Sequence, residues 1–414
     1  MDLAWISVGA LAIAVTLSMV TTINVGIVCM AFAWIVGVHL GGMSTGTILE
    51  GFPTSLFITL VGVTLFFSMA RGNGTLERVT ERAVRLCRGH AGLLPIVFFF
   101  LAFAMSTIGP GAIGAAALLA PPAMAVAART KGSLFLMAIM IGNGALAGSL
   151  SPFSPTGVVA NDVMVRMGYP GLEWEIFYNN IIGHALVAFG GFFLLGGLRL
   201  FRPGHGHASA ANDVSSQPFE PRHWLTLGLI ATLLVLVIGL RFEVGMTALT
   251  GAAILSFARA ADEKEAIRGM PWGVMLMVSG VTVLITLMEK NQGLELFTDL
   301  LVRLSTPESV TAVVAFVTGV VSVYSSTSGV VLPAFLPTVP GLVERLGGLD
   351  AIAVASAMNL GSHLVDLSPL STTGALCMAG IPAGVDPLGL FNKLLAWGLS
   401  MTVVGALVCW LMFG

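Results

Sequence analysis

The sequence predicts an all-α protein that crosses a membrane many times and consists of two inverted-topology repeats. Three observations predict this fold class. The 414 residues are 56% hydrophobic and 10% charged, with a mean hydropathy of +0.94, whereas soluble domains carry about 25% charged residues. Long apolar runs alternate with short charged segments. Two motifs that interrupt these runs occur twice, at nearly the same offset.

Composition also excludes several classes of protein. The net charge of −2 neither favours nor excludes nucleic acid, but no long basic run occurs, so nucleic-acid binding is not expected. Because so few residues are charged, lipid is the expected surroundings. No cofactor is expected. None of the four cysteines lies in a CxxC pair, and we expect small buried side chains at Cys29, Cys87, Cys377 and Cys409. Because the N-terminus lacks a positive region, the first apolar run is predicted to be a retained span.

The apolar runs give the expected spans. They lie at about 3–20, 23–40, 54–70, 91–128, 133–168, 179–198, 223–240, 244–258, 271–288, 309–345, 350–380 and 391–413. A single span needs about 20 residues, so 91–128 and 309–345 are too long, and both contain several Gly and Pro residues. We predict that each is a re-entrant hairpin, which is tolerated at membrane depth only within protein or beside water.

Charge sets the predicted orientation. The segment after the third span is rich in arginine, from Arg71 to Arg88, and the positive-inside rule places it in the cytoplasm. With two re-entrant hairpins, every later basic segment also falls inside, and the acidic flanks of the second hairpin fall outside. This membrane topology predicts a multi-pass protein of a bacterial inner (cytoplasmic) membrane, with both termini outside.

The predicted membrane topology divides the chain into two halves of opposite orientation. The first repeat covers 1–198, a polar cytoplasmic linker covers 199–222, and the second repeat covers 223–414. The hairpins at about 91–128 and 309–345 are followed by broken spans at about 133–168 and 350–380. A metal role for His205 and His207 in the linker is the less favoured alternative to a solvated segment.

Two motif pairs indicate the duplication. Ser-Pro-Phe-Ser-Pro-Thr-Gly at 151–157 matches Ser-Pro-Leu-Ser-Thr-Thr-Gly at 368–374, an offset of 217 residues (368 − 151). Ser-Thr-Ile-Gly at 106–109 matches Ser-Thr-Ser-Gly at 326–329, an offset of 220 (326 − 106). Inverted repeats with broken helices are typical of secondary transporters, which bind substrate at the midplane where the breaks meet.

The broken helices point to an anion site. A helix that restarts after a break presents free N–H groups and a partial positive charge of about half a unit, and such ends bind anions. The candidate substrate-binding residues are therefore Ser106, Thr107, Ser151, Ser154, Thr156, Ser326, Thr327, Ser368, Ser371, Thr372, Thr373 and His363. For each Ser and Thr, the alternative is a hydrogen bond back to its own helix.

His363 and Asp366 lie one turn apart in the eleventh apolar run, and the other half has Leu146 and Ser149 there. A charge at the centre of a membrane helix costs about 2.5–3.5 kcal/mol. We therefore expect Asp366 to coordinate a cation or exchange a proton, with His363 orienting it or donating to substrate. A structural His–Asp pair is the alternative. By contrast, the i,i+4 spacing of Asp162 and Arg166 predicts an ordinary ion pair.

A cation site is expected near these motifs. Sodium is the first candidate for the coupling ion and a proton is the second. The residues expected near sodium are Ser106, Asn143, Ser325, Asn359 and Asp366. For Asn143 and Asn359, hydrogen bonding between helices is an equal alternative.

At the repeated motifs the chain resembles the ion-transporter superfamily, and looks most like malonate/dicarboxylate carriers of MatC type, related to divalent-anion:sodium symporters. The resemblance covers the whole chain in topology and rests on the two tips and the two Ser-Pro loops. The symporter tips read Ser-Asn-Thr, whereas 106–108 reads Ser-Thr-Ile and 325–327 reads Ser-Ser-Thr. The resemblance implies a small dicarboxylate substrate such as malonate or succinate, cation coupling, a homodimer, and a transport domain that moves like an elevator.

Other functions were weighed against this one. A carrier of another organic or inorganic anion, or the membrane subunit of a binding-protein-dependent carboxylate transporter, would have the same architecture. An intramembrane enzyme is disfavoured because the sequence has no His-Glu-x-x-His motif and His363-x-x-Asp366 lacks a third ligand. A membrane-embedded scaffold or receptor subunit is equally disfavoured.

Overall fold

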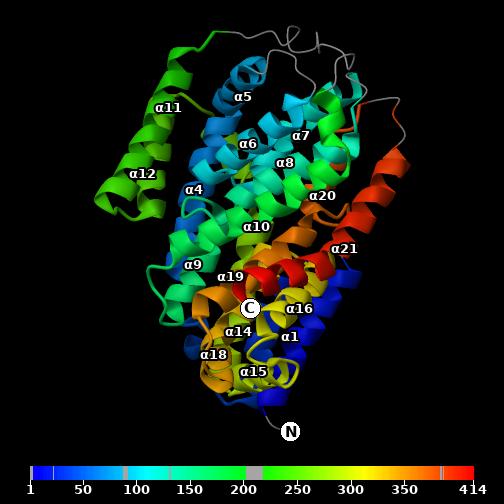
Figure 1. Ribbon diagram of the computed structural model, residues 1–414. Helices are drawn as coiled ribbons and strands as arrows, with labels where there is room; N and C mark the ends of the chain where they lie inside the picture. The colour runs from blue at the N-terminus through cyan, green and yellow to red at the C-terminus, as the bar shows by residue number, and fades with distance from the viewer. Residues whose placement is uncertain are drawn as a thin grey trace.

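The computed structural model describes residues 3–21, 23–86, 92–129, 132–201, 218–382, 385 and 387–414, and every regular element in these ranges is helical (Figure 1). Within this part of the chain, 7 helices are long and apolar enough to cross a membrane, and six further apolar helices have 10–17 residues. Large apolar side chains such as Phe257 and Leu194 are about 90% exposed, and lipid would solvate them. The helices are those that a multi-pass membrane protein requires.

The helices of the first half are α1 (Leu3–Val20), α2 (Val25–Trp34), η1 (Ile35–Leu40), α3 (Thr45–Leu49), α4 (Thr54–Gly72), α5 (Thr75–Leu86), α6 (Leu93–Ile108), α7 (Gly111–Arg129), α8 (Leu134–Gly148), α9 (Pro155–Arg166), α10 (Glu173–Leu194) and η2 (Gly197–Phe201). The π-helical turn η1 continues α2 directly.

The helices of the second half are α11 (Pro221–Leu234), η4 (Val235–Gly239), α12 (Val244–Phe257), α13 (Glu263–Arg268), α14 (Trp272–Lys290), α15 (Gly293–Arg303), α16 (Val310–Tyr324), η5 (Thr327–Val331), α17 (Leu332–Phe335), η6 (Leu336–Thr338), α18 (Val339–Leu346), α19 (Ala351–Leu364), η7 (Val365–Leu367), α20 (Thr372–Ala379) and α21 (Pro387–Phe413). Most of the predicted linker, with His205 and His207, and Cys87 lie outside the described residues.

Helix starts in the two halves recur at the offset of the sequence motifs. α6 and α16, α8 and α19, and α9 and α20 each begin 217 residues apart, and α4 and α14 begin 218 residues apart. These helices therefore follow in the same order in both halves, from α4 to α9 in the first and from α14 to α20 in the second.

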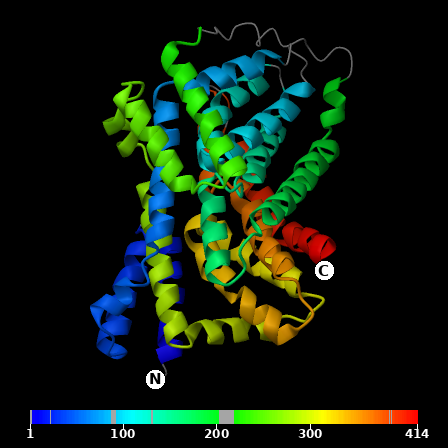
Figure 2. The ribbon, with the colours of Figure 1, turned by 90° about the vertical axis from the view of Figure 1, so that its left-hand side faces the viewer.

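Each half contains one hairpin. In the first hairpin, α6 turns into α7 at Gly109 and Pro110. In the second, α16 turns at Ser325 and Ser326 into an arm of four short pieces, η5, α17, η6 and α18. Prolines recur along that second arm, and each removes one backbone donor. The first hairpin lies toward one end of the molecule and the second toward the opposite end (Figures 1 and 2).

Among the described residues, two helix crossings between the halves pair one glycine with another. Gly62 of α4 faces Gly245 of α12, and a Cβ added at Gly62 would lie 2.2 Å from the Gly245 carbonyl oxygen. Gly26 of α2 faces Gly280 of α14, and a Cβ on Gly280 would lie 2.0 Å from the Gly26 oxygen. Each crossing pairs a helix of the first half with one of the second, so backbones approach closely as small residues allow in membranes.

Three amphipathic helices occupy charged segments that the sequence interpretation treated as connections between spans. They are α5, α13 and α15. Local caps explain two of the starts: Asn73 Oδ1 accepts from the Thr75 amide at 3.1 Å, and Asp262 Oδ1 accepts from the Glu265 amide at 3.0 Å. Such caps stabilise a helix start by about 1 kcal/mol.

Candidate functional site

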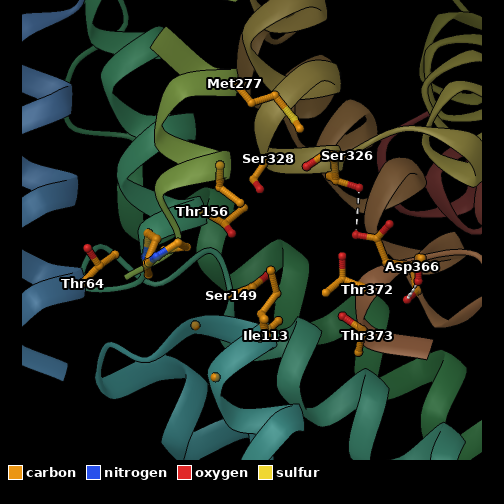
Figure 3. Close-up of a pocket in the computed structure, with 18 of the residues that line it drawn as sticks. Thr64, Ile113, Ser149, Thr156, Met277, Ser326, Ser328, Asp366, Thr372 and Thr373 are labelled. Carbon is orange, nitrogen blue, oxygen red and sulfur yellow. Dashed lines mark hydrogen bonds between the residues drawn. The ribbon is translucent and has the colours of Figure 1, made fainter. Parts of the chain in front are cut away.

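A cavity of about 490 Å³ lies between the two hairpin tips and the two broken spans. Figure 3 shows Thr64 of α4 on one side and Asp366 of η7 on the other, with Thr156 and Ser328 between them. Small-molecule sites have volumes of about 300–1,000 Å³, so the cavity fits a small ligand together with water.

Three of the helices that begin at the cavity wall start at the tips and broken spans and have eight or more residues. They are α7 after the first tip, α9 after the first Ser-Pro loop, and α20 after the second. The π-helical turn η5 starts there too, after the second tip. The first N–H groups of a helix have no carbonyl partner within it, so these ends place partial positive charge at the cavity. Some of these amides are bonded to the loops, such as that of Gly157 to the Ser149 carbonyl oxygen at 3.0 Å, and the others are donors for a ligand.

The cavity brings many of the predicted residues together. Seven of the twelve predicted substrate residues line it: Thr156, Ser326, Thr327, His363, Ser371, Thr372 and Thr373. Ser325 and Asp366 of the predicted sodium set line it as well. The other predicted residues form the protein behind the wall: Ser106, Thr107, Ser151, Ser154, Ser368, Asn143 and Asn359.

The residues behind the wall hold the loops in place. Ser151 Oγ donates to the Thr107 carbonyl oxygen at 2.7 Å, which ties the first Ser-Pro loop to the first tip. Thr107 Oγ1 donates back to the Phe103 carbonyl at 2.7 Å, the alternative foreseen for such residues. Ser106 and Ser154 are fully buried, and neither hydroxyl has a hydrogen-bond partner among the described residues.

The second loop is closed by Ser371. Its hydroxyl caps α20 by accepting from the Gly374 amide at 3.4 Å. Its single hydrogen is shared between two carbonyl oxygens, that of Asp366 just before the loop and that of Ser368, at 2.9 Å, at the start of the loop. The hydroxyl therefore holds the start of α20 against the end of η7.

Asp366 belongs to a buried hydroxyl cluster. Thr327 Oγ1, at the second tip, donates to Asp366 Oδ2 at 2.8 Å. Ser322 Oγ of α16 donates to Asp366 Oδ1 at 3.2 Å, and Ser322 and Thr327 also contact each other through their hydroxyls. The carboxylate therefore joins α16, the second tip and η7 at the cavity wall.

His363 does not pair with Asp366. Its Nδ1 lies 2.7 Å from the Asn359 carbonyl oxygen, one turn earlier in α19. Among the described residues, no hydrogen bond or ion pair therefore joins the two side chains, and the predicted orienting or structural contact is not formed. The i,i+4 backbone carbonyl was available to the ring, and Asp366 lies beyond the end of the α-helix.

The sequence interpretation missed His184 and Ser322. His184 of α10 is fully buried, and its Nδ1 lies 3.0 Å from Asn143 Oδ1. Asn143 thus joins α8 to α10, as the alternative for it predicted. A lone histidine in an apolar run was the available signal for His184, whereas nothing distinguished Ser322 from other serines.

Two simpler expectations are confirmed by the structure. Asp162 and Arg166 form the predicted ion pair, at 2.6 Å. Cys29, Cys377 and Cys409 are free and buried, as predicted. Within the described ranges, no three His, Cys, Asp or Glu residues lie close enough to hold a metal ion.

Among the described residues that line the cavity, Arg71 is the one lysine or arginine. It ends a stripe of α4 with Thr64, Phe67 and Ser68, positions i, i+3, i+4 and i+7 of one helix face. Beyond the helix, burial raises the pKa of the Glu77 carboxyl, and the Arg71 guanidinium opposes that shift. Arg71 therefore supplies positive charge at the rim.

We expect Arg71→Gln to raise the KM for an anionic substrate by about threefold or more, because a rim cation raises the local anion concentration. The maximal rate should change little, and the dependence of KM on ionic strength should weaken. Initial rates at low and high salt measure this. The control is Arg268→Gln, since Arg268 is exposed on α13 and does not line the cavity. An unchanged KM in Arg71→Gln would contradict the role.

The geometry can now be compared with known proteins. Residues 1–149 match a family described as "Dicarboxylate carrier protein MatC N-terminus". No curated protein matches the sequence closely enough to count as a relative. Two solved structures share the fold, each with a TM-score of 0.61 and 13% identity.

The first of these structures is the YdaH transporter of Alcanivorax borkumensis, where the match covers 91% of this chain and 88% of the other. The second is MtrF of Neisseria gonorrhoeae, described with a class of antimetabolite efflux pumps, with coverage of 89% and 83%. The carrier-family match and the shared fold indicate a transporter rather than an enzyme.

Proposed function

We propose that this protein is a secondary active transporter of a small dicarboxylate, malonate or a C4-dicarboxylate such as succinate, coupled to a cation. The observation that carries the proposal is the single cavity wall on which three helix N-termini and the second tip meet. Free N–H groups and hydroxyls there suit carboxylates. The match of residues 1–149 to dicarboxylate carriers supports the substrate class.

Cation coupling is supported by a count of hydrogens. Ser322, Thr327 and Asp366 make three oxygen–oxygen contacts with one another. Two hydroxyls supply two hydrogens, and Thr327 Oγ1 also lies 3.4 Å from the Ser362 carbonyl oxygen, so at least one contact lacks a hydrogen when Asp366 is ionised. A proton on Asp366 would supply the missing hydrogen. A cation bound by these oxygens would take the place of that proton.

Sodium is supported by buried oxygens that lack hydrogen bonds. Within the predicted sodium set, Ser106 Oγ, Ser325 Oγ and Asn359 Oδ1 are buried and have no hydrogen-bond partner among the described residues. Hard cations prefer such oxygen ligands. We therefore propose sodium as the coupling ion, with a proton at Asp366 as the alternative.

The two hairpins at opposite ends and the recurring helix offset support two inverted repeats around the cavity (Figures 1 and 2). The proposal includes alternating access in which the tips and broken spans move together, in a homodimer with its termini outside the membrane. The homodimer and the joint movement follow from the family resemblance, and the position of the termini follows from the positive-inside rule.

Uptake by the purified protein in liposomes tests the proposal. Labelled malonate and succinate should accumulate with an inward sodium gradient, and to a smaller extent with a proton gradient alone. Empty liposomes and gradients collapsed by ionophores are the controls. Failure to move any C3 or C4 diacid under either gradient would overturn the substrate class. A panel of other organic and inorganic anions then tests the alternative, a different anion on the same fold.

A further inference from the structure

The tautomer of His363 is set by the structure. Its side chain is 2% exposed, and it lines the cavity from α19. Its Nδ1 lies 2.7 Å from the Asn359 carbonyl oxygen. A carbonyl oxygen can only accept, so Nδ1 carries the hydrogen, and Nε2 of the neutral ring is an acceptor.

The surroundings favour the neutral ring. The nearest titratable groups on the packed elements are Asp366 of η7, which bonds Ser322 and Thr327 instead, and the His184 ring of α10, whose centroid is 6.4 Å away. Tyr324 and Arg71 line other parts of the cavity. An imidazolium at this position would be a buried charge without an ion pair among the described residues, which is costly.

Nε2 of His363 has no hydrogen-bond partner among the described residues, in contrast to Nδ1. Its neighbour Asp366 also presents acceptor oxygens to this wall. The donors of the cavity include those at the starts of α9 and α20. The site therefore offers donors for one end of a ligand and an acceptor for another.

Resting on the proposed function, we propose that the transported dicarboxylate binds in its monoprotonated form and donates its remaining acid hydrogen to Nε2 of His363. A fully ionised diacid carries only acceptors and would place a carboxylate against the lone pair of the ring. The ionised carboxylate of the monoanion binds the N–H groups at the starts of α9 and α20. His363 thereby selects for a substrate that bears a donor.

Two analogues of the transported diacid test this. Its half-amide and its half-methyl ester each keep one carboxylate, and only the half-amide keeps N–H donors. In competition with labelled diacid at constant pH, we expect the half-amide to inhibit at a concentration about tenfold lower, because a site built to bond a donor rejects an analogue without one. Constant pH keeps the titration of Asp366 out of the comparison.

Variants assign the preference to the ring. His363→Leu should reduce the difference between the analogues to within about threefold, and His363→Gln, which retains an acceptor oxygen, should keep part of it. The matched control is His184→Leu. His184 is equally buried and its Nδ1 is likewise bonded, at 3.0 Å to Asn143 Oδ1, but it does not line the cavity. This variant should keep the full difference.

Equal inhibition by the two analogues in the wild type would overturn the inference, as would an undiminished difference in His363→Leu. If His363→Leu does not fold, the inference is still tested by comparing the two analogues in the wild type and in His363→Gln. If labelled diacid is not taken up at all, the proposed function is wrong. Failure of the proposed function can therefore be distinguished from failure of the inference about His363.

Discussion

Asp366→Asn should remove the dependence of diacid uptake on the driving cation and lower uptake by about tenfold or more, since a hydrogen bond to a charged group contributes roughly 1.5–3 kcal/mol. The asparagine keeps the size of the side chain and can still accept from Thr327 and contact Ser322. The fold should therefore persist while the negative charge is lost. Uptake with sodium and proton gradients, applied separately, measures the change.

The matched control is Asp162→Asn. Asp162 also lies on a broken span, but it pairs with Arg166 at 2.6 Å and does not line the cavity. This variant should keep its gradient dependence. Asp366→Asn with unaltered sodium and pH dependence would exclude the carboxylate from coupling, whatever the total rate.

Gly374→Ala should reduce uptake to background. A Cβ at Gly374 would lie 2.0 Å from the Ser368 carbonyl oxygen, inside the second Ser-Pro loop. The methyl group must push the start of α20 away from the loop, which displaces Thr372 and Thr373 from the cavity. Overpacking of this kind costs about 1–3 kcal/mol, so thermal stability in detergent should also fall.

The control for this loop is Gly190→Ala in α10, where an added Cβ meets nothing within 4 Å. Because alanine favours a helix interior over glycine by about 0.5–1 kcal/mol, this variant should be as stable as the wild type or slightly more so. Gly157→Ala, at the matching position of the first loop, should behave like Gly374→Ala, since its Cβ would lie 2.0 Å from the Ser151 oxygen. Normal uptake by Gly374→Ala would contradict the prediction, because it would show that the loop accommodates the methyl group without loss of transport.

The sequence predicted the breaks at Gly109 and Pro155 because proline and glycine act locally, whereas Pro121 and Pro122 lie inside the continuous helix α7. Pro155 begins α9 and Gly109 turns the first hairpin with φ +152°, a conformation that side chains rarely adopt. The offset of the two Ser-Pro motifs also matched the helix starts. These signals do not depend on partners far along the chain.

Contacts between distant residues could not be predicted in the same way. The bond between Thr327 and Asp366 spans 39 residues, and that between His184 and Asn143 spans 41. Spacing alone favoured a contact between His363 and Asp366, but the ring bonds to its own helix backbone. Equally, the sequence does not show which hydroxyls face the cavity and which support its wall, because that depends on how α6, α8 and α19 pack.

The glycine crossings set the order in which the protein can be assembled during synthesis. Gly62 and Gly26 belong to helices made early, and their partners Gly245 and Gly280 emerge roughly two hundred residues later. Until then, α2 and α4 are left in the bilayer with their small-residue faces unpaired. The first half therefore waits for the second, and two separately expressed halves should be stable only when both are present in the same membrane.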